Sequence, residues 1–244
     1  MHSPEHLPQA GVGESITADN ASWSFDGAVA RTFSDHVSRS VPFYDAGHDL
    51  ICSLSDFFLT NGSNCYELGC STGSLIRKLA KQHSGKDICF YGLDSVPNML
   101  EQARTEGADL SNITLELADI TDYEFKLSDL IVSYYTIQFI RPKYRQELIN
   151  SIYKSLNWGG AFLLFEKVRS PDARFQDISS CIYNDYKLSK GYTPSQILAK
   201  SRALKGVLEP FSTQGNLDLL YRAGFSDITT VFKWVSFEGF LAIK

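Results

Sequence analysis

Apolar residues between positions 28 and 60 recur every three to four residues, which is the spacing of one helical face. Pro42 interrupts this pattern, and the turn-forming residues 61–64 end it. The residues before it are polar and show no comparable periodicity. We therefore expect a flexible N-terminal arm over 1–22 and an N-terminal helical cap over 23–60.

From residue 64 onward, short apolar segments alternate with amphipathic helical segments. The apolar segments predict strands over 64–68, 87–94, 114–117, 130–135 and 161–166. The amphipathic segments predict helices over 74–82, 97–106, 141–156 and 217–223, with a turn at 157–160. Strands that alternate with helices in this way are typical of βαβ units and a parallel sheet.

Two segments depart from the alternation. Residues 171–210 combine helical patterning with polar and aromatic residues, which predicts a helical insertion. The patterns at 228–234 and 239–243 predict an antiparallel hairpin. The sequence thus predicts an α/β fold with a mostly parallel sheet and a helical cap, built as a single domain over 23–244.

The composition narrows the function classes. The 244 residues are 43% hydrophobic, which excludes wholesale disorder, and the net charge of −5 disfavours a direct nucleic-acid partner. We find no apolar run of the roughly 18 residues that a membrane span needs and no signal-peptide pattern, so we expect no membrane association. The five cysteines form no CxxC pair and the five histidines are scattered. This usage predicts no metal site and favours the cytoplasm.

The first candidate for chemistry is the segment YELGCSTGS at 66–74, where a strand meets a glycine-bearing turn and then a helix. Gly69 would let a ligand approach the backbone, and Gly73 permits a tight helix entry. No lysine follows, unlike a phosphate-binding loop, and Ser71 replaces the middle glycine of GxGxxG. The pattern favours a nucleoside without phosphates, although an ordinary strand–helix turn has the same appearance.

Two acidic residues follow the next two predicted strands. Asp94 ends the second strand, where a carboxylate can accept both hydroxyls of a ribose. Asp119 ends the third strand, where it can bind an adenine amino group while Ile120 covers the ring. The alternatives are a helix N-cap at Asp94 and an ordinary loop aspartate at Asp119.

The order of these motifs resembles that of class I S-adenosylmethionine (SAM)-dependent methyltransferases. The motifs in question are ELGCSTGS, GLD, LADI, SYYTIQF and LNWGGAFLLFEK, between about residues 60 and 168. The resemblance implies a Rossmann-like sheet, SAM as cofactor and S-adenosylhomocysteine (SAH) as product. It places Glu67 and Gly69 at the methionine and sugar, Asp94 at the ribose, and residues 134–139 beside the sulfonium.

A closer resemblance, over nearly the whole chain, is to the carboxy-SAM synthases. These enzymes use prephenate to carboxylate the methyl group of SAM, and their product serves wobble-uridine modification in tRNA. The segments that carry the resemblance are WSFD, RSVPFY, ELGCS, TIQF, EK and KGY. The implied cofactor contacts are Tyr44, Gly69, Cys70, Ser71, Asp94, Ser95, Asp119 and Ile120. The family's use of its helical insertion between subunits implies a homodimer.

The chain departs from that family at two positions. The family has an asparagine where this chain has Tyr134, and an arginine for the carboxylate of the modified cofactor where it has Ser201. The neighbouring Arg202 would point about 100° further around a helix. A carboxylate beside a sulfonium needs a fixed cationic partner, so we interpret the chain as a divergent member.

Methyl transfer needs a base only when the acceptor must lose a proton. Our catalytic candidates are His36, Glu166 and Tyr134. The alternatives are a surface or capping role for His36, and for Glu166 a salt bridge with Lys167 or another basic residue. Our candidates for substrate binding are Tyr44, Tyr135 and Arg202.

Three functions remain open from the sequence. The leading hypothesis is a methyltransferase acting on a small-molecule substrate, because the acidic charge disfavours a nucleic acid and aromatic residues fill the predicted cap. The second is carboxy-SAM synthesis, which would handle carboxy-SAM as well as SAM. The third is a non-catalytic protein that binds SAM or SAH.

Overall fold

The computed structural model describes residues 36–244. The arm expected at 1–22 and the first part of the cap expected at 23–60 lie outside the described residues. Residues 36–40 are helical. The helices that follow are α2 (Tyr44–Ser55), α3 (Ser74–Gln82), α4 (Pro97–Glu106), the 3-10 helix η1 (Ile137–Phe139), α5 (Pro142–Ser155), α6 (Ala173–Ser189), α7 (Pro194–Ala203) and α8 (Thr213–Ala223). No helix of this part of the chain is long and apolar enough to cross a membrane.

Seven strands form one sheet in the order β3-β2-β1-β4-β5-β7-β6. Their bounds are β1 (Asn64–Leu68), β2 (Cys89–Asp94), β3 (Ile113–Leu117), β4 (Ser128–Tyr134), β5 (Leu156–Lys167), β6 (Asp227–Trp234) and β7 (Phe237–Ile243). The first five strands pair in parallel, and β7 pairs antiparallel with both β5 and β6. The predicted α/β fold, with its mostly parallel sheet and C-terminal antiparallel hairpin, is confirmed.

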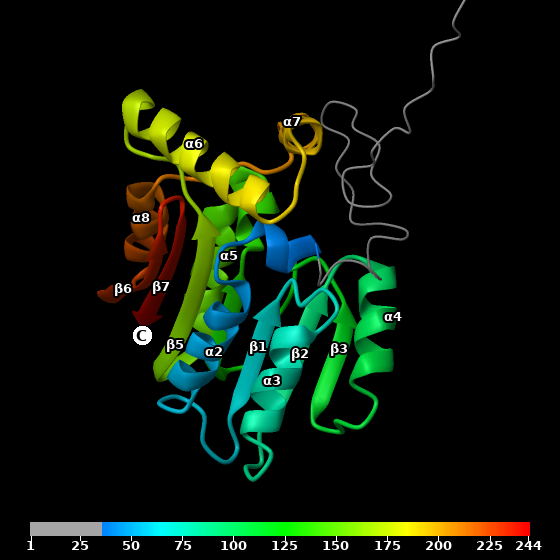
Figure 1. Ribbon diagram of the computed structural model, residues 1–244. Helices are drawn as coiled ribbons and strands as arrows, with labels where there is room; N and C mark the ends of the chain where they lie inside the picture. The colour runs from blue at the N-terminus through cyan, green and yellow to red at the C-terminus, as the bar shows by residue number, and fades with distance from the viewer. Residues whose placement is uncertain (1–35) are drawn as a thin grey trace, which may run out of the picture.

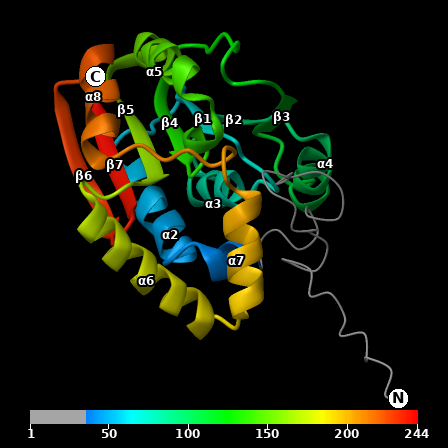
Figure 2. The same cartoon turned by 90° about the horizontal axis from the view of Figure 1, so that it is seen from above.

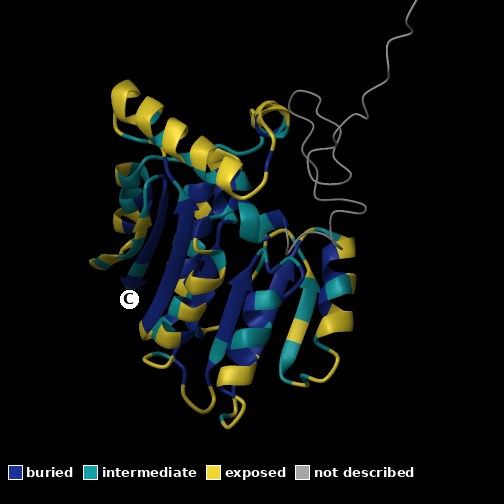
Figure 3. Ribbon diagram, in the orientation of Figure 1, coloured by how far each residue is buried: buried dark blue, intermediate teal, exposed yellow. Residues whose placement is uncertain are grey.

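Helices cover both faces of this sheet (Figures 1 and 2). Apolar residues of α2 and α3 pack with the strands in one buried cluster, and those of α5 and α8 pack in another. The inner strands β1, β2, β4, β5 and β7 are mostly buried and dark blue in Figure 3, whereas the edge strands β3 and β6 are partly exposed. Long apolar runs such as that of β5 therefore reflect a strand with protein on both sides.

The helical insertion forms α6 and α7, which lie above the carboxyl ends of the parallel strands (Figure 1). The end of α6 and the start of α7 are joined by a short turn at Gly191, whose φ of 88° suits a glycine. The insertion thus roofs the sheet edge where α/β proteins bind ligands.

Several predicted boundaries are wrong: α8, for example, begins at Thr213 and not at residue 217. The apolar pattern of the cap ran to residue 60, but α2 ends at Ser55. The turn expected at 157–160 belongs to β5 instead. There the backbone N–H of Gly159 donates to the carbonyl of Lys244, and the N–H of Lys244 donates to the carbonyl of Gly160. Pairing with the distant C-terminus therefore makes a strand of residues whose local signal is a turn.

Candidate functional site

A cavity of about 770 Å³ opens at the carboxyl ends of the strands. It lies where the strand order reverses between β1 and β4, which is the switch point at which open α/β sheets bind ligands. The loops after β1, β2, β3 and β4 line it from the sheet side, and α6 and α7 line it from above. The loop segments singled out from the sequence are thus brought together in one place.

The loop after β1 has a backbone that glycine makes accessible. Gly69 has a φ of 70°, Ser71 a φ of 51° and Gly73 a φ of 72°. A Cβ at Gly69 would lie 2.4 Å from Cγ2 of Thr136, in the loop after β4. Thr136 therefore excludes a side chain at position 69, even without a bound ligand. Close packing of the two loops sets the floor of the cavity.

Asp94 ties two of these loops together. Its Oδ2 accepts a hydrogen bond from the N–H of Ser71 at 2.7 Å, and its Oδ1 accepts one from the N–H of Val96 at 2.9 Å. Burial raises the pKa of this carboxyl, while the backbone donors oppose the rise. Asp94 thus organises the loops after β1 and β2, and it lines the cavity where the proposed ribose would lie.

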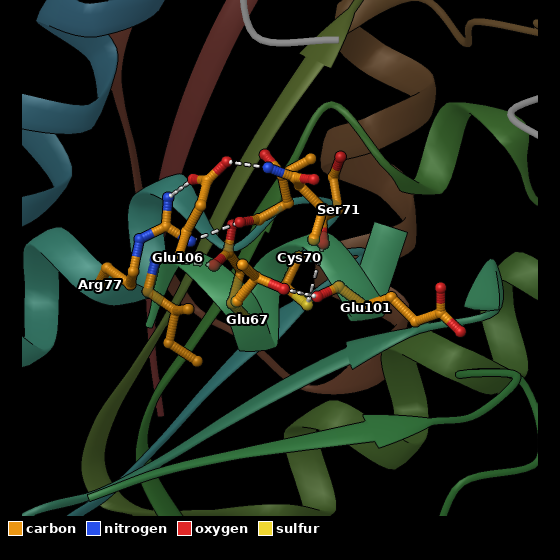
Figure 4. A network of polar contacts seen from close by, with 10 residues as sticks. Glu67, Cys70, Ser71, Arg77, Glu101 and Glu106 are labelled. Atoms are coloured by element: carbon orange, nitrogen blue, oxygen red, sulfur yellow. Dashed lines mark hydrogen bonds and ion pairs between the residues drawn. The ribbon is translucent and has the colours of Figure 1, made fainter. Parts of the chain in front are cut away.

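Glu67, on the neighbouring strand β1, also binds a backbone N–H group through its carboxylate. Its Oε2 accepts a hydrogen bond of 2.9 Å from the N–H of Ile76 in the first turn of α3. Burial raises the pKa of Glu67 to about 8. Figure 4 shows Glu67, Cys70 and Ser71 on this part of the chain, with the ion pair of Arg77 and Glu106 beside them.

The remaining candidates for the nucleoside lie along the same wall. Cys70, Ser95, Asp119 and Ile120 all line the cavity. Ile120 is buried, and Oδ1 of Asp119 accepts hydrogen bonds from the N–H and the hydroxyl of Thr121. None of the described residues that line the cavity from the loops after β1, β2 and β3 is basic. This end therefore suits a nucleoside without phosphates and with a positive charge.

Aromatic rings line the cavity next to the loop after β4. The rings of Tyr44 and Tyr134 are 5.3 Å apart, and His48 packs against both of them. The Tyr134 hydroxyl donates a 2.7 Å hydrogen bond to the carbonyl of Tyr44, and burial raises its pKa. A Cβ at Gly47 would lie 2.1 Å from this hydroxyl, so the glycine makes the contact possible. Tyr134 therefore connects the sheet to α2 through this hydrogen bond. Its ring lines the cavity, and its hydroxyl is poorly suited to act as a base.

Tyr135 follows the end of β4, and Glu166 lies near the end of the neighbouring strand β5. Tyr135 lines the cavity at a φ of 60°, and its buried hydroxyl has no hydrogen-bond partner among the described residues. Glu166 is 1% exposed and does not line the cavity. Burial raises the pKa of Glu166 to about 8, opposed by Arg145 and by the backbone N–H groups of Ile137 and Gln138. Glu166 thus holds the start of η1, and it forms no ion pair with Lys167.

His36 lines the cavity within a network that fixes its ring. Nζ of Lys200 donates to Nε2 of His36 at 2.7 Å and to Oγ of Ser40 at 2.8 Å. Nδ1 of His36 lies 3.1 Å from the hydroxyl of Tyr192. Burial and the charge of Lys200 lower the pKa of His36 to about 3. The ring is therefore neutral and accepts from Lys200, which leaves it poorly suited to take a proton.

Helix α7 presents Ser201, not Arg202, to the cavity. Lys200 and Ser201 line it, whereas Arg202 is exposed and does not. This follows from the 100° that separates successive residues on a helix. The position at which the carboxy-SAM synthases have an arginine is thus at the cavity wall, but it carries a hydroxyl.

Several basic residues of the cavity could not be recognised from the sequence. Lys167, Lys187 and Lys200 line it from β5, α6 and α7, and Gln138 lines it from η1. The Gln138 side chain donates to the carbonyl of Tyr135 and accepts from the N–H of Lys167. No local pattern marks these residues, because they come from separate elements that only the fold brings together. The sequence suggested Lys167 only as an ion-pair partner for Glu166.

Comparisons with known proteins agree with this geometry. A model of the methyltransferase domain matches residues 66–160. The carboxy-S-adenosyl-L-methionine synthase of Staphylococcus epidermidis is 36% identical over 223 residues, which are 91% of this chain and 97% of that protein. The enzyme of the same name from Sulfurimonas denitrificans is 39% identical over 228 residues, which are 91% of this chain and 94% of that protein.

Solved structures show the same fold at low sequence identity. Human N-acetylserotonin methyltransferase in complex with SAM aligns with a TM-score of 0.60 and 17% identity, over 88% of this chain and 55% of that one. The SAM-dependent methyltransferase SibL in its apo form aligns with a TM-score of 0.61 and 15% identity, over 94% and 63%. The chain spans less than two thirds of either protein. By its similarity to full-length relatives, this chain belongs to the carboxy-S-adenosyl-L-methionine synthase family, and it has the fold of SAM-dependent methyltransferases.

Proposed function

We propose that this protein is a SAM-dependent methyltransferase that transfers a methyl group to a small-molecule acceptor by in-line displacement, releasing SAH. The observation that carries the proposal is the cavity at the switch point, where Asp94 and the loop after β1 meet an aromatic wall. The acidic side chains on this side suit a cationic nucleoside. The names of the relatives and the SAM-bound human neighbour support SAM as that nucleoside.

SAM, when bound, supplies a methyl group that its sulfonium charge already activates. The protein then has to hold the donor, align the acceptor and exclude water. In this proposal Asp94 and Ser95 hold the ribose, and Asp119 and Ile120 hold the adenine. The rest of the donor, its methionine part, lies against Glu67, Gly69, Cys70 and Ser71. The rings of Tyr44 and Tyr134 suit a sulfonium, because aromatic faces attract cations.

The position of Ser201 favours methyl transfer over carboxy transfer. A carboxylate beside a sulfonium calls for a bidentate cation, and an arginine fulfils that need best. Here α7 offers a hydroxyl at that position, and Arg202 lies outside the cavity. Tyr134, in place of an asparagine, presents a ring whose hydroxyl is already bound to Tyr44.

Mass spectrometry of small molecules tests this proposal directly. The purified protein is incubated with SAM, with and without prephenate, and with pools of candidate acceptors. We expect bound SAM or SAH, SAH formation that depends on an acceptor, and no carboxylated SAM. Formation of carboxy-SAM with prephenate would overturn the choice of reaction. Absence of both SAM and SAH, with no binding by calorimetry, would overturn the cofactor assignment.

Carboxy-SAM synthesis is the second candidate. It is favoured by the identity to enzymes of that name over 91% of the chain. It is also favoured by Lys167, Lys187 and Lys200, which could supply positive charge in place of the missing arginine. The prephenate experiment separates the two reactions, since only the carboxy transfer needs prephenate.

The assembly and location form part of the same proposal. Helix α6 exposes Phe175, Ile178 and Ile182, whose spacing places them on one helical face. An apolar row of this kind favours a homodimer through α6. All five cysteines lie in the described part of the chain and are unpaired there, which supports a cytoplasmic location.

A further inference from the structure

A buried arginine lies next to the wall of the cavity but does not line the cavity itself. Arg145, near the start of α5, is 1% exposed. Within residues 36–244, no carboxylate forms an ion pair with it. Removing a charge from water is costly, so buried charges are normally paired or well hydrogen-bonded. The groups that take the place of water around this guanidinium therefore indicate its role.

The guanidinium of Arg145 binds two backbone carbonyls of the loop after β4. Its Nε donates to the carbonyl of Ile140 at 2.8 Å, and its Nη2 donates to the carbonyl of Gln138 at 3.1 Å. Both Gln138 and Ile140 line the cavity. A planar guanidinium holds two acceptors in a fixed geometry, whereas the ammonium of a lysine acts as a single flexible point charge. Arg145 therefore fixes the backbone at the end of η1.

Opposite charges hold the two ends of η1. At its start, the backbone N–H groups of Ile137 and Gln138 donate to the Glu166 carboxylate. At its end, the carbonyls accept from the Arg145 guanidinium. This arrangement matches the helix dipole, which favours an anion at the N-terminal end and a cation at the C-terminal end. A 3-10 helix of three residues has little stability of its own, so these side chains determine where η1 lies.

Arg145 also connects η1 to a second part of the cavity wall, residues 208–211. Its Cζ lies 4.4 Å from the centroid of the Phe211 ring, which is a cation–π contact. The backbone N–H of Glu209 donates at 3.0 Å to the carbonyl of Gln138 that Arg145 also binds. Most of this segment lines the cavity. Two segments that are far apart in the chain thus meet at one buried guanidinium.

We infer that Arg145 is a positioning residue for methyl transfer, because it holds η1 and residues 208–211 in the places that align the acceptor with the donor. This role rests on the proposed function, since it belongs to the same reaction. Arg145 acts only through the backbone that it binds. In-line displacement depends on alignment, and a misplacement of about 1 Å can lower the rate about 100-fold. The proposed nucleoside contacts come from the loops after β1, β2 and β3, which Arg145 does not hold.

Hydrogen exchange followed by mass spectrometry tests whether Arg145 holds the two segments, and it needs no ligand. Arg145→Lys keeps a positive charge but loses the two-point contact. We expect the backbone amides of segments 137–140 and 208–211 to exchange about tenfold faster or more, while those of β1 and β2 exchange as in wild type. Arg141→Lys is the matched control, because Arg141 is exposed at the start of the same helix and does not line the cavity. Unchanged exchange of both segments in Arg145→Lys would overturn the inference.

Steady-state kinetics tests the role in the reaction, with the acceptor that the mass-spectrometry experiment identifies. We expect Arg145→Lys to lower kcat about tenfold or more, and to bind SAH within about threefold of wild type by calorimetry. Arg141→Lys should match wild type in both measurements. A merely structural role would lower the rate and SAH binding together. An equal loss of both, or a kcat within about threefold of wild type, would therefore overturn the inference.

A second variant keeps the inference testable if melting curves show that Arg145→Lys does not fold. Phe211→Leu retains an apolar side chain but removes the ring that contacts the guanidinium. We expect faster exchange of segment 208–211 and a kcat lowered about threefold, with SAH affinity unchanged. Wild-type values for exchange and kcat would overturn the inference. If the wild-type protein neither binds SAH nor methylates any acceptor, the proposed function fails, and the exchange experiment still shows whether Arg145 holds the two segments.

Discussion

At the scale of single residues, the site is built from side chains that hold backbone in place. Asp94 accepts from Ser71 and Val96, and Glu67 accepts from Ile76. Both acids could be picked out from the sequence, since each lies at or next to the end of a strand of a βαβ unit. Their backbone partners show that the acids shape the loops before any ligand arrives.

Replacing Asp94 tests its part in nucleoside binding. We expect Asp94→Asn to weaken SAH binding about 10- to 100-fold, because a charge-assisted acceptor becomes a neutral one. The melting temperature should change little, since the amide oxygen still accepts from one backbone N–H. Asp87→Asn, at an exposed position before β2, is the control. Calorimetry with an unchanged affinity for Asp94→Asn would contradict a ribose role.

Gly69 tests the packing of the loops. Gly69→Ala should lower the free energy of unfolding by about 2–5 kcal/mol, since it combines a positive φ with a clash against Thr136. Gly62→Ala should cost only about 1–2 kcal/mol, because Gly62 has a φ of 85° but no atom within 4 Å of the added Cβ. Urea unfolding of both variants measures the difference. An equal loss of unfolding free energy in both variants would show that the contact between the new Cβ and Thr136 is relieved at no cost.

At the scale of elements, the position of η1 and of the side chains that bind it determines which groups line the cavity. The Glu166 carboxylate accepts hydrogen bonds from the backbone of η1. The Gln138 side chain on η1 forms hydrogen bonds with the backbone of Tyr135 and of Lys167. The sequence places Glu166 at the correct edge of the sheet. Only the packing of η1 over β5 separates it from the cavity.

Glu166→Gln distinguishes support of η1 from base catalysis. A buried Gln can still accept hydrogen bonds from the backbone of η1. We therefore expect the rate of SAH formation, measured with an acceptor that the enzyme methylates, to stay within about threefold of wild type. Loss of a general base would instead lower the rate about 10²- to 10⁴-fold. The rate of SAH release, followed by mass spectrometry, gives the answer. A loss of that size in a folded variant would restore Glu166 as a catalytic residue.

The exposed face of α6 makes a prediction about assembly. Ile178→Glu should convert a dimer into a monomer, because it places a charge in the middle of the apolar row that includes Phe175 and Ile182. Trp158→Glu removes an even more exposed apolar side chain, on β5, and should leave the assembly unchanged. Light scattering after size-exclusion chromatography measures the masses. A wild-type monomer would contradict the proposed homodimer.

At the scale of the whole molecule, charge is separated across the cavity. Apart from Glu209, the acidic residues that line it come from the first half of the chain, and Lys167, Lys187 and Lys200 come from β5 and the insertion. The net charge of −5 gives no hint of this arrangement. The division suits a cationic donor on one side and an anionic partner on the other.

The lowered pKa values of three lysines that line the cavity predict how stability depends on pH. Burial lowers the pKa values of Lys167, Lys187 and Lys200 to about 8, 8 and 7. The lysines of the unfolded chain keep their protons to higher pH, so the protein should become more stable between about pH 8 and 10.

Urea unfolding across pH 6.5 to about 9.5 checks this trend. The Lys187→Gln variant should flatten the dependence of stability on pH, whereas Lys190→Gln, at an exposed position on the same helix end, should leave it as in wild type. Stability that does not change with pH would contradict lowered pKa values in the folded state.

The sequence by itself determined the order of strands and helices, the βαβ units and the motif-bearing loops. It could do so because periodicity, glycines and strand-ending acids are local signals. Tertiary structure alone decided that residues 157–160 extend β5 by pairing with the C-terminus, that Ser201 and not Arg202 faces the cavity, and that Glu166 lies behind η1. It also brought Lys167, Lys187 and Lys200 to one cavity, since contacts between residues far apart in the chain leave no local pattern to find.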